Sequence, residues 1–175
     1  MAGILIVYSS IDGHTRTICE RLRQLTEGSG RSVTLVSIDD ADAVDLAAFD
    51  KIVVGASIRY GKHRQRVLDF VNANANVLDA RPNAFFSVNI VARKPQKNRP
   101  ETNPYVRKFL QQVRWRPKHL EVFAGRLDYP RYGLVDRLMI RFIMWVTRGP
   151  TDPATVVEFT DWSRVEAFGK RIGTM

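Results

Sequence analysis

The chain has 175 residues, 45% of them hydrophobic, which suits one soluble domain with a single core spanning residues 1–175. Its only cysteine, Cys19, excludes a disulfide within the chain and argues against a multi-cysteine metal site, so we expect no metal. The net charge is +9. No stretch reaches the roughly 18 to 20 apolar residues of a membrane span, and no signal peptide is recognisable. We therefore expect a cytoplasmic protein that does not cross a bilayer.

The first predicted element is a short apolar strand, residues 3–8 (GILIVY). A continuous apolar run of this length is typical of a strand buried on both faces of a parallel sheet. A polar turn follows at residues 9–14. Apolar residues at helical spacing then predict a helix over residues 15–27, which ends at the Gly-Ser-Gly of residues 28–30.

Strands and helices alternate along the rest of the chain. The further predicted strands cover residues 32–38, 51–56, 84–90 and 120–124, and the further helices cover residues 65–78 and 161–172. Residues 39–49 are predicted to form an acidic loop or a short helix. This alternation indicates an α/β fold, a doubly wound parallel sheet of five strands with helices on both faces.

The turn after the first strand has the chemistry of an anion site. A strand that runs through a Ser/Gly/Thr turn into a helix directs backbone N–H groups and the positive helix end to one point. Ser10, His14 and Thr15 add side-chain donors, and Gly13 allows close approach. The turn lacks the triphosphate and dinucleotide glycine patterns and contributes no Lys or Arg, which favours a phosphate monoester held by neutral donors. The alternative is an ordinary helix cap.

The positive charge is concentrated in one stretch, residues 91–150, which carries 14 basic and 4 acidic side chains. Residues 1–90 are balanced, with 10 of each. A partner that this charge attracts is therefore expected to contact this stretch rather than the whole protein surface. No RNA-binding aromatic platform and no DNA-reading motif accompanies the stretch, so we expect no nucleic-acid partner.

An additional apolar segment, residues 134–148, is predicted to form a helix with a basic stripe. Arg137, Arg141 and Arg148 fall within about 40° of one another on a helical wheel, and the remaining circumference is mostly apolar. At 1.5 Å per residue the helix spans roughly 22 Å, less than the ~30 Å hydrocarbon core of a bilayer. With Trp145 it suits a helix lying in the membrane interface. Packing on its own domain and burial in a homo-oligomer are equally open alternatives.

The turn also resembles a known motif. Residues 10–15 (SIDGHT) resemble the flavodoxin phosphate loop, Ser/Thr-x-Thr-Gly-Asn-Thr, with Gly13 and Thr15 matching. His14 stands where Asn is usual, and Asp12 stands where a Thr is usual. A carboxylate facing a phosphate would repel it, so we expect Asp12 to turn away and cap the helix.

More specific motifs run nearly from end to end. They are GASIRYGKH at residues 55–63, FFSVNIVARKP at 85–95, WRP at 115–117, YPRY at 129–132, DRLMIRFIM at 136–144 and TDW at 160–162. Together they resemble the menaquinone-dependent protoporphyrinogen IX dehydrogenases, a flavodoxin-like family of bacterial haem synthesis. The resemblance implies a flavodoxin-like fold with a long insertion, residues 126–154, that splits the last strand, which would resume near residues 156–159.

The resemblance also implies an FMN cofactor held by three loops. The phosphate is expected at Ser9, Ser10, Ile11, Asp12, Gly13, His14 and Thr15. The flavin ring is expected beside Ser57, Ile58, Arg59, Tyr60 and Gly61 and beside Ser87, Val88, Asn89 and Ile90. Tyr60 would stack on the ring, or alternatively pack under its own loop. At the position that follows Ile90 in this chain, flavodoxins usually have a Gly-Asp and a Tyr that stacks on the flavin. The absence of these residues here favours an enzyme over an electron carrier.

The implied reaction is six-electron dehydrogenation of protoporphyrinogen IX with menaquinone as acceptor. Because the quinone resides in the membrane, the resemblance favours a peripheral location on the cytoplasmic face of the inner membrane. The membrane-facing residues would be Arg137, Arg141, Trp145 and Arg148, and a homo-oligomer stays possible. Arg59, Arg93 and Lys94 are candidates for holding the substrate propionates, with a solvated basic loop as the alternative. We assign no catalytic base. The alternative functions are a flavodoxin-type electron carrier, disfavoured by the positive stretch, and an FMN-dependent quinone reductase.

Overall fold

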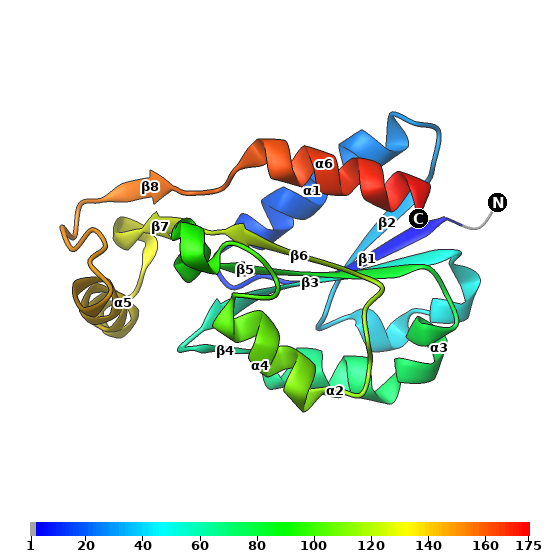
Figure 1. The fold of residues 1–175 in the computed structure, drawn as a ribbon, viewed down its shortest axis with the longest axis horizontal. Coiled ribbons are helices and arrows are strands. Elements are labelled where there is room, and N and C mark those ends of the chain that lie inside the picture. The colour runs from blue at the N-terminus through cyan, green and yellow to red at the C-terminus, as the bar shows by residue number, and fades with distance from the viewer. Residues whose placement is uncertain (1–2) are drawn as a thin grey trace.

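A five-stranded parallel sheet forms the centre of the protein in the computed structural model, which describes residues 3–175 (Figure 1). Its strands, in chain order, are β1 (Ile4–Ser9), β2 (Val33–Ser37), β3 (Lys51–Arg59), β5 (Asn83–Asn89) and β6 (His119–Ala124). The spatial order is β2-β1-β3-β5-β6, and the two-residue β4 (Lys62–His63) pairs antiparallel with the end of β3. This is the doubly wound order of flavodoxin-like folds, so the predicted fold class is confirmed.

Helices cover both faces of the sheet. α1 (His14–Glu27) and α6 (Trp162–Thr174) lie on one face, and α2 (Gln65–Ala73), α3 (Ala75–Asp79) and α4 (Pro104–Gln112) lie on the other (Figure 1). Alternate residues of β1 pack into the two core layers, because successive side chains of a strand point to opposite faces of the sheet. Leu5 and Val7 pack with α2, whereas Ile4 and Ile6 pack with α1 and α6.

The loops at the carboxyl ends of the strands are fixed by local caps. Gly13 precedes α1 with a φ of 93°, a backbone conformation that favours glycine. Asn103 caps α4 by accepting hydrogen bonds from the N–H groups of Tyr105 and Val106 at 3.1 and 3.3 Å, and Pro104 occupies the first helical position. These caps set where the two helices begin beside the sheet edge.

The chain leaves the sheet between β6 and α6. This segment, residues 126–158, is called the insertion here, and it contains β7 (Arg126–Asp128), α5 (Leu134–Val146) and β8 (Val156–Glu158). The expectation that the last parallel strand resumes near residues 156–159 is wrong, because β8 pairs antiparallel with β7, away from the main sheet. A chain that travels out and returns places its two ends in opposite directions, which is the geometry of an antiparallel ribbon.

α5 ends two residues earlier than predicted. Arg148 has a φ of 59° and lies beyond the helix, and the N–H of Gly149 donates to the carbonyl of Met144 at 2.7 Å. Arg148 therefore does not continue the basic stripe expected from the helical wheel. Through residues 3–175, no helix combines the length and the apolar character that crossing a bilayer requires.

Candidate functional site

A cavity of about 440 Å³ lies where the carboxyl ends of β1, β3 and β5 meet the insertion. Doubly wound sheets bind ligands at this edge, and the volume falls within the usual range for small-molecule sites. Ile11, Asp12, His14, Thr15, the stretch from Ser57 to Gly61 and the stretch from Val88 to Val91 line one side, and residues of the insertion line the other. The three loops predicted from the sequence are therefore brought together.

The loop of residues 9–15, called the phosphate loop below, has two buried hydroxyls without hydrogen-bond partners. Among residues 3–175, Ser9 Oγ and Thr15 Oγ1 are buried and make no hydrogen bond. A buried hydroxyl without a partner costs roughly 1–3 kcal/mol, and a bound ligand is one way to supply the missing partner. Ser9 ends β1, and Thr15 lies in the first turn of α1, where backbone N–H groups also point outward. This donor set fits a phosphate monoester.

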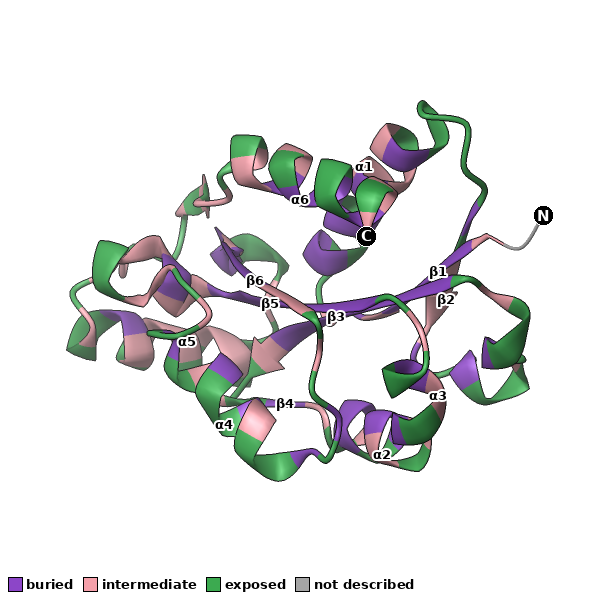
Figure 2. Cartoon of the chain, turned by 45° about the vertical axis from the view of Figure 1, so that its right-hand side comes forward, coloured by how far each residue is buried: buried purple, intermediate pink, exposed green. Residues whose placement is uncertain are grey.

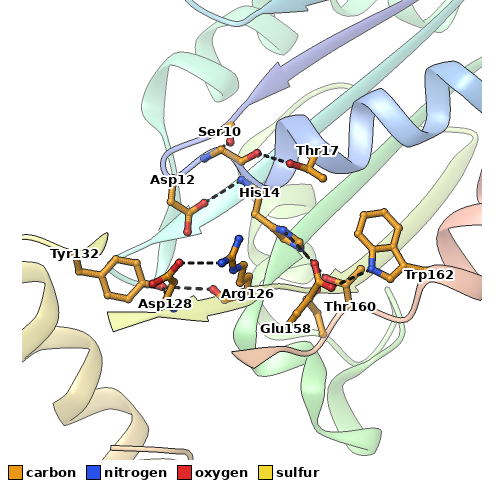
Figure 3. A network of polar contacts seen from close by, with 12 residues as sticks. Ser10, Asp12, His14, Thr17, Arg126, Asp128, Tyr132, Glu158, Thr160 and Trp162 are labelled. Carbon is orange, nitrogen blue, oxygen red and sulfur yellow. Dashed lines mark hydrogen bonds and ion pairs between the residues drawn. The ribbon is translucent and has the colours of Figure 1, made fainter. Parts of the chain in front are cut away.

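Asp12 partly follows the expectation. Its Oδ1 accepts a hydrogen bond from the N–H of His14, the first residue of α1, at 3.3 Å, so the carboxylate serves the helix start. The side chain nevertheless lies among the cavity-lining residues (Figure 3). An anion in the phosphate loop would therefore have a carboxylate neighbour.

The His14 side chain was expected to be a donor to the ligand, and the structure gives it another partner. Its Nε2 lies 2.7 Å from Thr160 Oγ1, whose own proton goes to the carbonyl of Ala124 at 2.6 Å (Figure 3). The hydroxyl must then accept, so Nε2 of His14 is the protonated nitrogen. Burial lowers the pKa of His14 below its usual value, although the carboxylates of Glu158 and Asp12 act in the opposite direction. Because burial has the larger effect, the ring is neutral near pH 7. His14 therefore anchors the loop to the return of the insertion.

Arg126 brings a positive charge to this end of the cavity. It comes from β7 and pairs with Asp128 at 3.0 Å (Figure 3). It lines the cavity together with Asp12 and Thr15. Its charge is one of the influences that lower the pKa of His14. The phosphate loop itself contains no Lys or Arg, but the assembled cavity brings a cation to its side. No local signal identifies Arg126, because it lies more than a hundred residues from the loop in sequence.

The loop of residues 57–61, called the flavin loop below, ends in a tight hairpin. Tyr60 and Gly61 have φ values of 51° and 75° between the paired residues Arg59 and Lys62, the arrangement of a type I′ turn. Tyr60 is half-exposed rather than packed under its own loop, and its hydroxyl donates to Asp136 of α5. This contact raises the pKa of Tyr60 and lowers the pKa of Asp136.

The end of β5 rests on a buried polar network. Asn89 and Asn103 exchange side-chain hydrogen bonds at 3.2 and 3.0 Å, and Ser87 Oγ contacts both Asn89 and, at 2.9 Å, Nε2 of His63. Burial lowers the pKa of His63 to about 3, so this ring is neutral. Val88, Asn89 and Ile90 line the cavity as predicted, whereas Ser87 lies beneath it and is not among the lining residues.

Tyr105 is a further aromatic wall that the sequence did not indicate. It lies on α4, whose start is set by Asn103, and it lines the cavity beside the flavin loop. A Cβ atom on Gly61 would lie 4.0 Å from its ring. The lack of a stacking Tyr directly after Ile90 therefore does not leave this side without an aromatic residue.

Two of the three predicted propionate-binding residues lie elsewhere. Arg93 donates to the carbonyl of Ile90 at 3.1 Å and to the carbonyl and hydroxyl of Thr147 at 3.2 and 3.1 Å, so it ties the end of α5 to the 3₁₀ helix that follows β5. Lys94 is not among the cavity residues; burial and nearby positive charges lower its pKa. Within the 3₁₀ helix Ile90–Arg93, Ile90 and Val91 line the cavity, whereas Arg93 does not. Of the three, only Arg59 lines the cavity.

α5 has an apolar outer face, and its predicted basic stripe turns inward. Arg137 donates to the carbonyls of Tyr129 and Tyr132, and Arg141 donates to the carbonyl of Thr151 at 2.8 Å. These bonds satisfy loop carbonyls of the insertion itself, so neither arginine is free to face a membrane. The outer face consists of exposed apolar side chains: Leu134, Val135, Leu138, Met139, Phe142, Trp145 and Val146. Figure 2 accordingly colours part of α5 as exposed. Trp145 is exposed as predicted.

The inner face of α5 belongs to the protein's own core. Ile140, Ile143 and Met144 pack with Leu127 and Tyr129, and the same three α5 side chains line the cavity. Packing on its own domain, one of the three alternatives for this helix, is therefore true of one face. The cavity thus has a polar end at the phosphate loop and an apolar wall at α5.

Comparison with known proteins identifies a family and relatives for this chain. Residues 5–154 match the family described as Flavodoxin domain. A protein of Leishmania major named protoporphyrinogen IX dehydrogenase (quinone) is 46% identical over 165 residues, covering 94% of this chain and 71% of that protein. An Escherichia coli K12 protein of the same name is 42% identical over 168 residues, covering 96% and 93%.

Solved structures share the fold at low identity. Flavodoxin 1 from Bacillus cereus aligns with a TM-score of 0.53 and 14% identity over 99% of this chain and 98% of that one. A flavodoxin from the domain Archaea aligns with a TM-score of 0.51 and 15% identity over 98% and 96%. Both support the strand order described above.

Proposed function

The chain belongs to the flavodoxin-domain family and, within it, to the quinone-dependent protoporphyrinogen IX dehydrogenases, and from that premise we propose that it oxidises protoporphyrinogen IX with menaquinone as acceptor. Protoporphyrin IX would be the product, formed by loss of six electrons, and the step would serve haem synthesis. Membership makes the protein an oxidoreductase with a flavin cofactor. That the flavin is FMN, and that the quinone is menaquinone, are parts of the proposal.

One observation carries the proposal: the phosphate loop, the flavin loop and the apolar wall of α5 line the same cavity. An electron carrier needs only the flavin edge, whereas an enzyme for a wide apolar macrocycle needs an apolar wall beside the flavin. Ile140, Ile143 and Met144 supply that wall and would exclude water from it.

The residues of the phosphate loop fit FMN. Ser9, Thr15 and the N-terminus of α1 would hold the phosphate, and Arg126 would offset both its charge and that of Asp12. Tyr60 and Tyr105 would border the ring. Bound FMN supplies the two-electron acceptor for each of the three oxidation cycles. We assign no protein base, since His14 is committed to Thr160 and His63 is buried with a pKa of about 3.

We also propose that the outer face of α5 attaches the protein to the cytoplasmic face of the inner membrane. Apolar side chains on a helix that lies along a surface can enter the boundary between headgroups and acyl chains. The positive charges of Arg93, Lys97 and Arg148 lie close enough to Lys94 to lower its pKa, so a basic cluster adjoins the C-terminal end of α5. Anionic lipid would contribute about 1 kcal/mol per basic residue near the surface.

An anaerobic assay tests the enzymatic proposal. The FMN-loaded protein would be mixed with protoporphyrinogen IX, and porphyrin fluorescence followed with and without a menaquinone analogue. Growth of fluorescence that depends on the quinone is expected. Flavin binding without such growth would contradict the proposal and leave the electron carrier in its place.

A further inference from the structure

Two donors at the mouth of the cavity converge on one carboxylate. Arg59 Nη2 contacts Oδ2 of Asp136, and the hydroxyl of Tyr60 contacts Oδ1 of the same residue. All three residues line the cavity. The side chain of Arg59 is 43% exposed and that of Asp136 is 20% exposed, so the contact is open to solvent and to a ligand.

The two donors come from one element and their acceptor comes from another. Arg59 and Tyr60 belong to the β3–β4 hairpin, whose type I′ turn sets the direction of both side chains. The guanidinium of Arg59 lies 5.5 Å from the ring centre of Tyr60, so the pair forms one unit. Asp136 comes from another element, the first turn of α5, and reaches across the cavity mouth to this unit.

We propose that Arg59 and Tyr60 form the binding site for a carboxylate of the substrate, and that Asp136 occupies this site until the substrate carboxylate displaces it. An arginine beside a hydroxyl donor is well suited to bind a carboxylate through both oxygens. Because the two donors hold one carboxylate at a time in this way, substrate and Asp136 compete. The inference rests on the proposed function for the identity of the substrate, a porphyrinogen with two propionates.

Displacement of Asp136 has a structural consequence. The two contacts of Asp136 join the flavin loop to the start of α5 across the cavity mouth. A substrate carboxylate that takes over Arg59 and Tyr60 would release the start of α5 and widen the entrance. A ligand without carboxylates gains nothing from Arg59 and Tyr60 and does not compete with Asp136, so the exchange favours dicarboxylic macrocycles over their esters.

Competition, rather than titration, would drive the exchange. Hydrogen bonding to Tyr60 and the charge of Arg59 lower the pKa of Asp136, so its carboxylate stays ionised near neutral pH. Donation to Asp136 raises the pKa of Tyr60, so its hydroxyl keeps its proton. Both partners therefore keep their charge states at the pH values where the protein would work.

The test compares porphyrin binding in Asp136→Asn with binding in the wild type. Protoporphyrin IX and its dimethyl ester would be titrated into the FMN-loaded protein and binding followed by porphyrin fluorescence. Asp136→Asn is expected to bind the diacid about two- to fivefold more tightly, as when an exposed ion pair no longer has to be broken, and to bind the diester unchanged. Asp42→Asn, which removes the 2.7 Å partner of Arg66 away from the cavity, is the matched control.

Further variants keep the test decisive. Tyr60→Phe, and Arg59→Gln added to Asp136→Asn, should weaken diacid binding and leave the diester unchanged, and retained FMN binding would show that each variant is folded. An unchanged ratio of diacid to diester affinity in Asp136→Asn, with turnover of protoporphyrinogen intact, would overturn this inference alone. A shifted ratio without turnover would overturn the proposed function alone. Absence of both effects would overturn the two together.

Discussion

Nε2 of His14 donates a hydrogen bond to Oγ1 of Thr160 across 2.7 Å, and this bond joins the phosphate loop to the segment that leads into α6. The hydroxyl of Thr160 in turn donates to the carbonyl of Ala124, the last residue of β6. The start of α1 is thus tied to the end of the last parallel strand through side chains of distant segments. The phosphate loop is therefore held in part by a contact between residues that are 146 positions apart in the sequence.

Thr15→Val should separate ligand binding from stability. The Thr15 hydroxyl is buried without a partner, so an isosteric valine should leave the free energy of unfolding of the flavin-free protein within about 0.5 kcal/mol, or raise it. FMN affinity, measured by quenching of flavin fluorescence, should fall about tenfold or more, because a hydrogen bond to a charged phosphate is lost.

The matched control is Thr26→Val. The hydroxyl of Thr26 is also buried, but it donates to the carbonyl of Leu22 at 2.8 Å. This variant should lose about 1 kcal/mol of stability and keep its FMN affinity. Unchanged FMN affinity in Thr15→Val would remove that hydroxyl from the phosphate site.

Arg126→Gln should weaken FMN binding but not riboflavin binding. The two ligands differ in the phosphate, so loss of a cation beside the phosphate loop should lower FMN affinity roughly tenfold and leave riboflavin unaffected. The difference should shrink as the salt concentration rises. Asp128→Asn should accompany the substitution, because Asp128 is buried and would otherwise lose its partner. Equal losses for the two flavins would mean that Arg126 acts through the fold.

His63 should make the folded state less stable in acid. Burial lowers the pKa of His63 from 6.5 to about 3. At pH values between these two, the unfolded chain binds a proton on His63 and the folded protein does not. Stability is therefore fully present above pH 6.5 and falls as the pH decreases, by about 2 kcal/mol at pH 5 from this group. Urea unfolding at pH 7.5, 6 and 5 measures the slope, which should be shallower in His63→Gln. Equal slopes would contradict a neutral buried ring.

Phe142→Ser combined with Trp145→Ser should abolish flotation with anionic vesicles. Both side chains belong to the outer face of α5, and Trp145 is 68% exposed, so their loss removes apolar surface from the membrane contact. Val156→Ser, at an exposed apolar position on β8, is the control and should still float. Vesicle binding by the double variant would contradict the membrane proposal. A wild-type dimer that buries the outer face of α5 would also contradict it.

The central sheet could be predicted because its signals are local. Residues 3–8 and 84–90 are apolar runs bounded by polar turns, and the strands Ile4–Ser9 and Asn83–Asn89 lie within one residue of those ranges. The phosphate loop could be predicted for the same reason, since the strand, the turn and the start of α1 are contiguous in the chain.

The directions of the arginines could not be predicted. Arg93 and Arg137 have the same sequence signature whether they face solvent, a ligand or a loop carbonyl, and only tertiary packing shows that both bind carbonyls. Arg126 was missed for the opposite reason, because its neighbours in space are far away in sequence. The pairing of β8 with β7 likewise joins segments that are about thirty residues apart, which no local pattern indicates.

The insertion is closed at its base by a single backbone hydrogen bond, from the N–H of Phe159 to the carbonyl of Gly125, at 3.0 Å. The chain therefore departs from the sheet and rejoins it at nearly the same point, and the register of the five parallel strands does not depend on what lies between. Such a junction lets evolution, or an engineer, lengthen, shorten or transplant the excursion as a unit. The residues of α5 that would meet macrocycle and lipid can then be exchanged while Arg126, at the base of the excursion, stays beside the phosphate loop, so that flavin binding and substrate choice can vary separately.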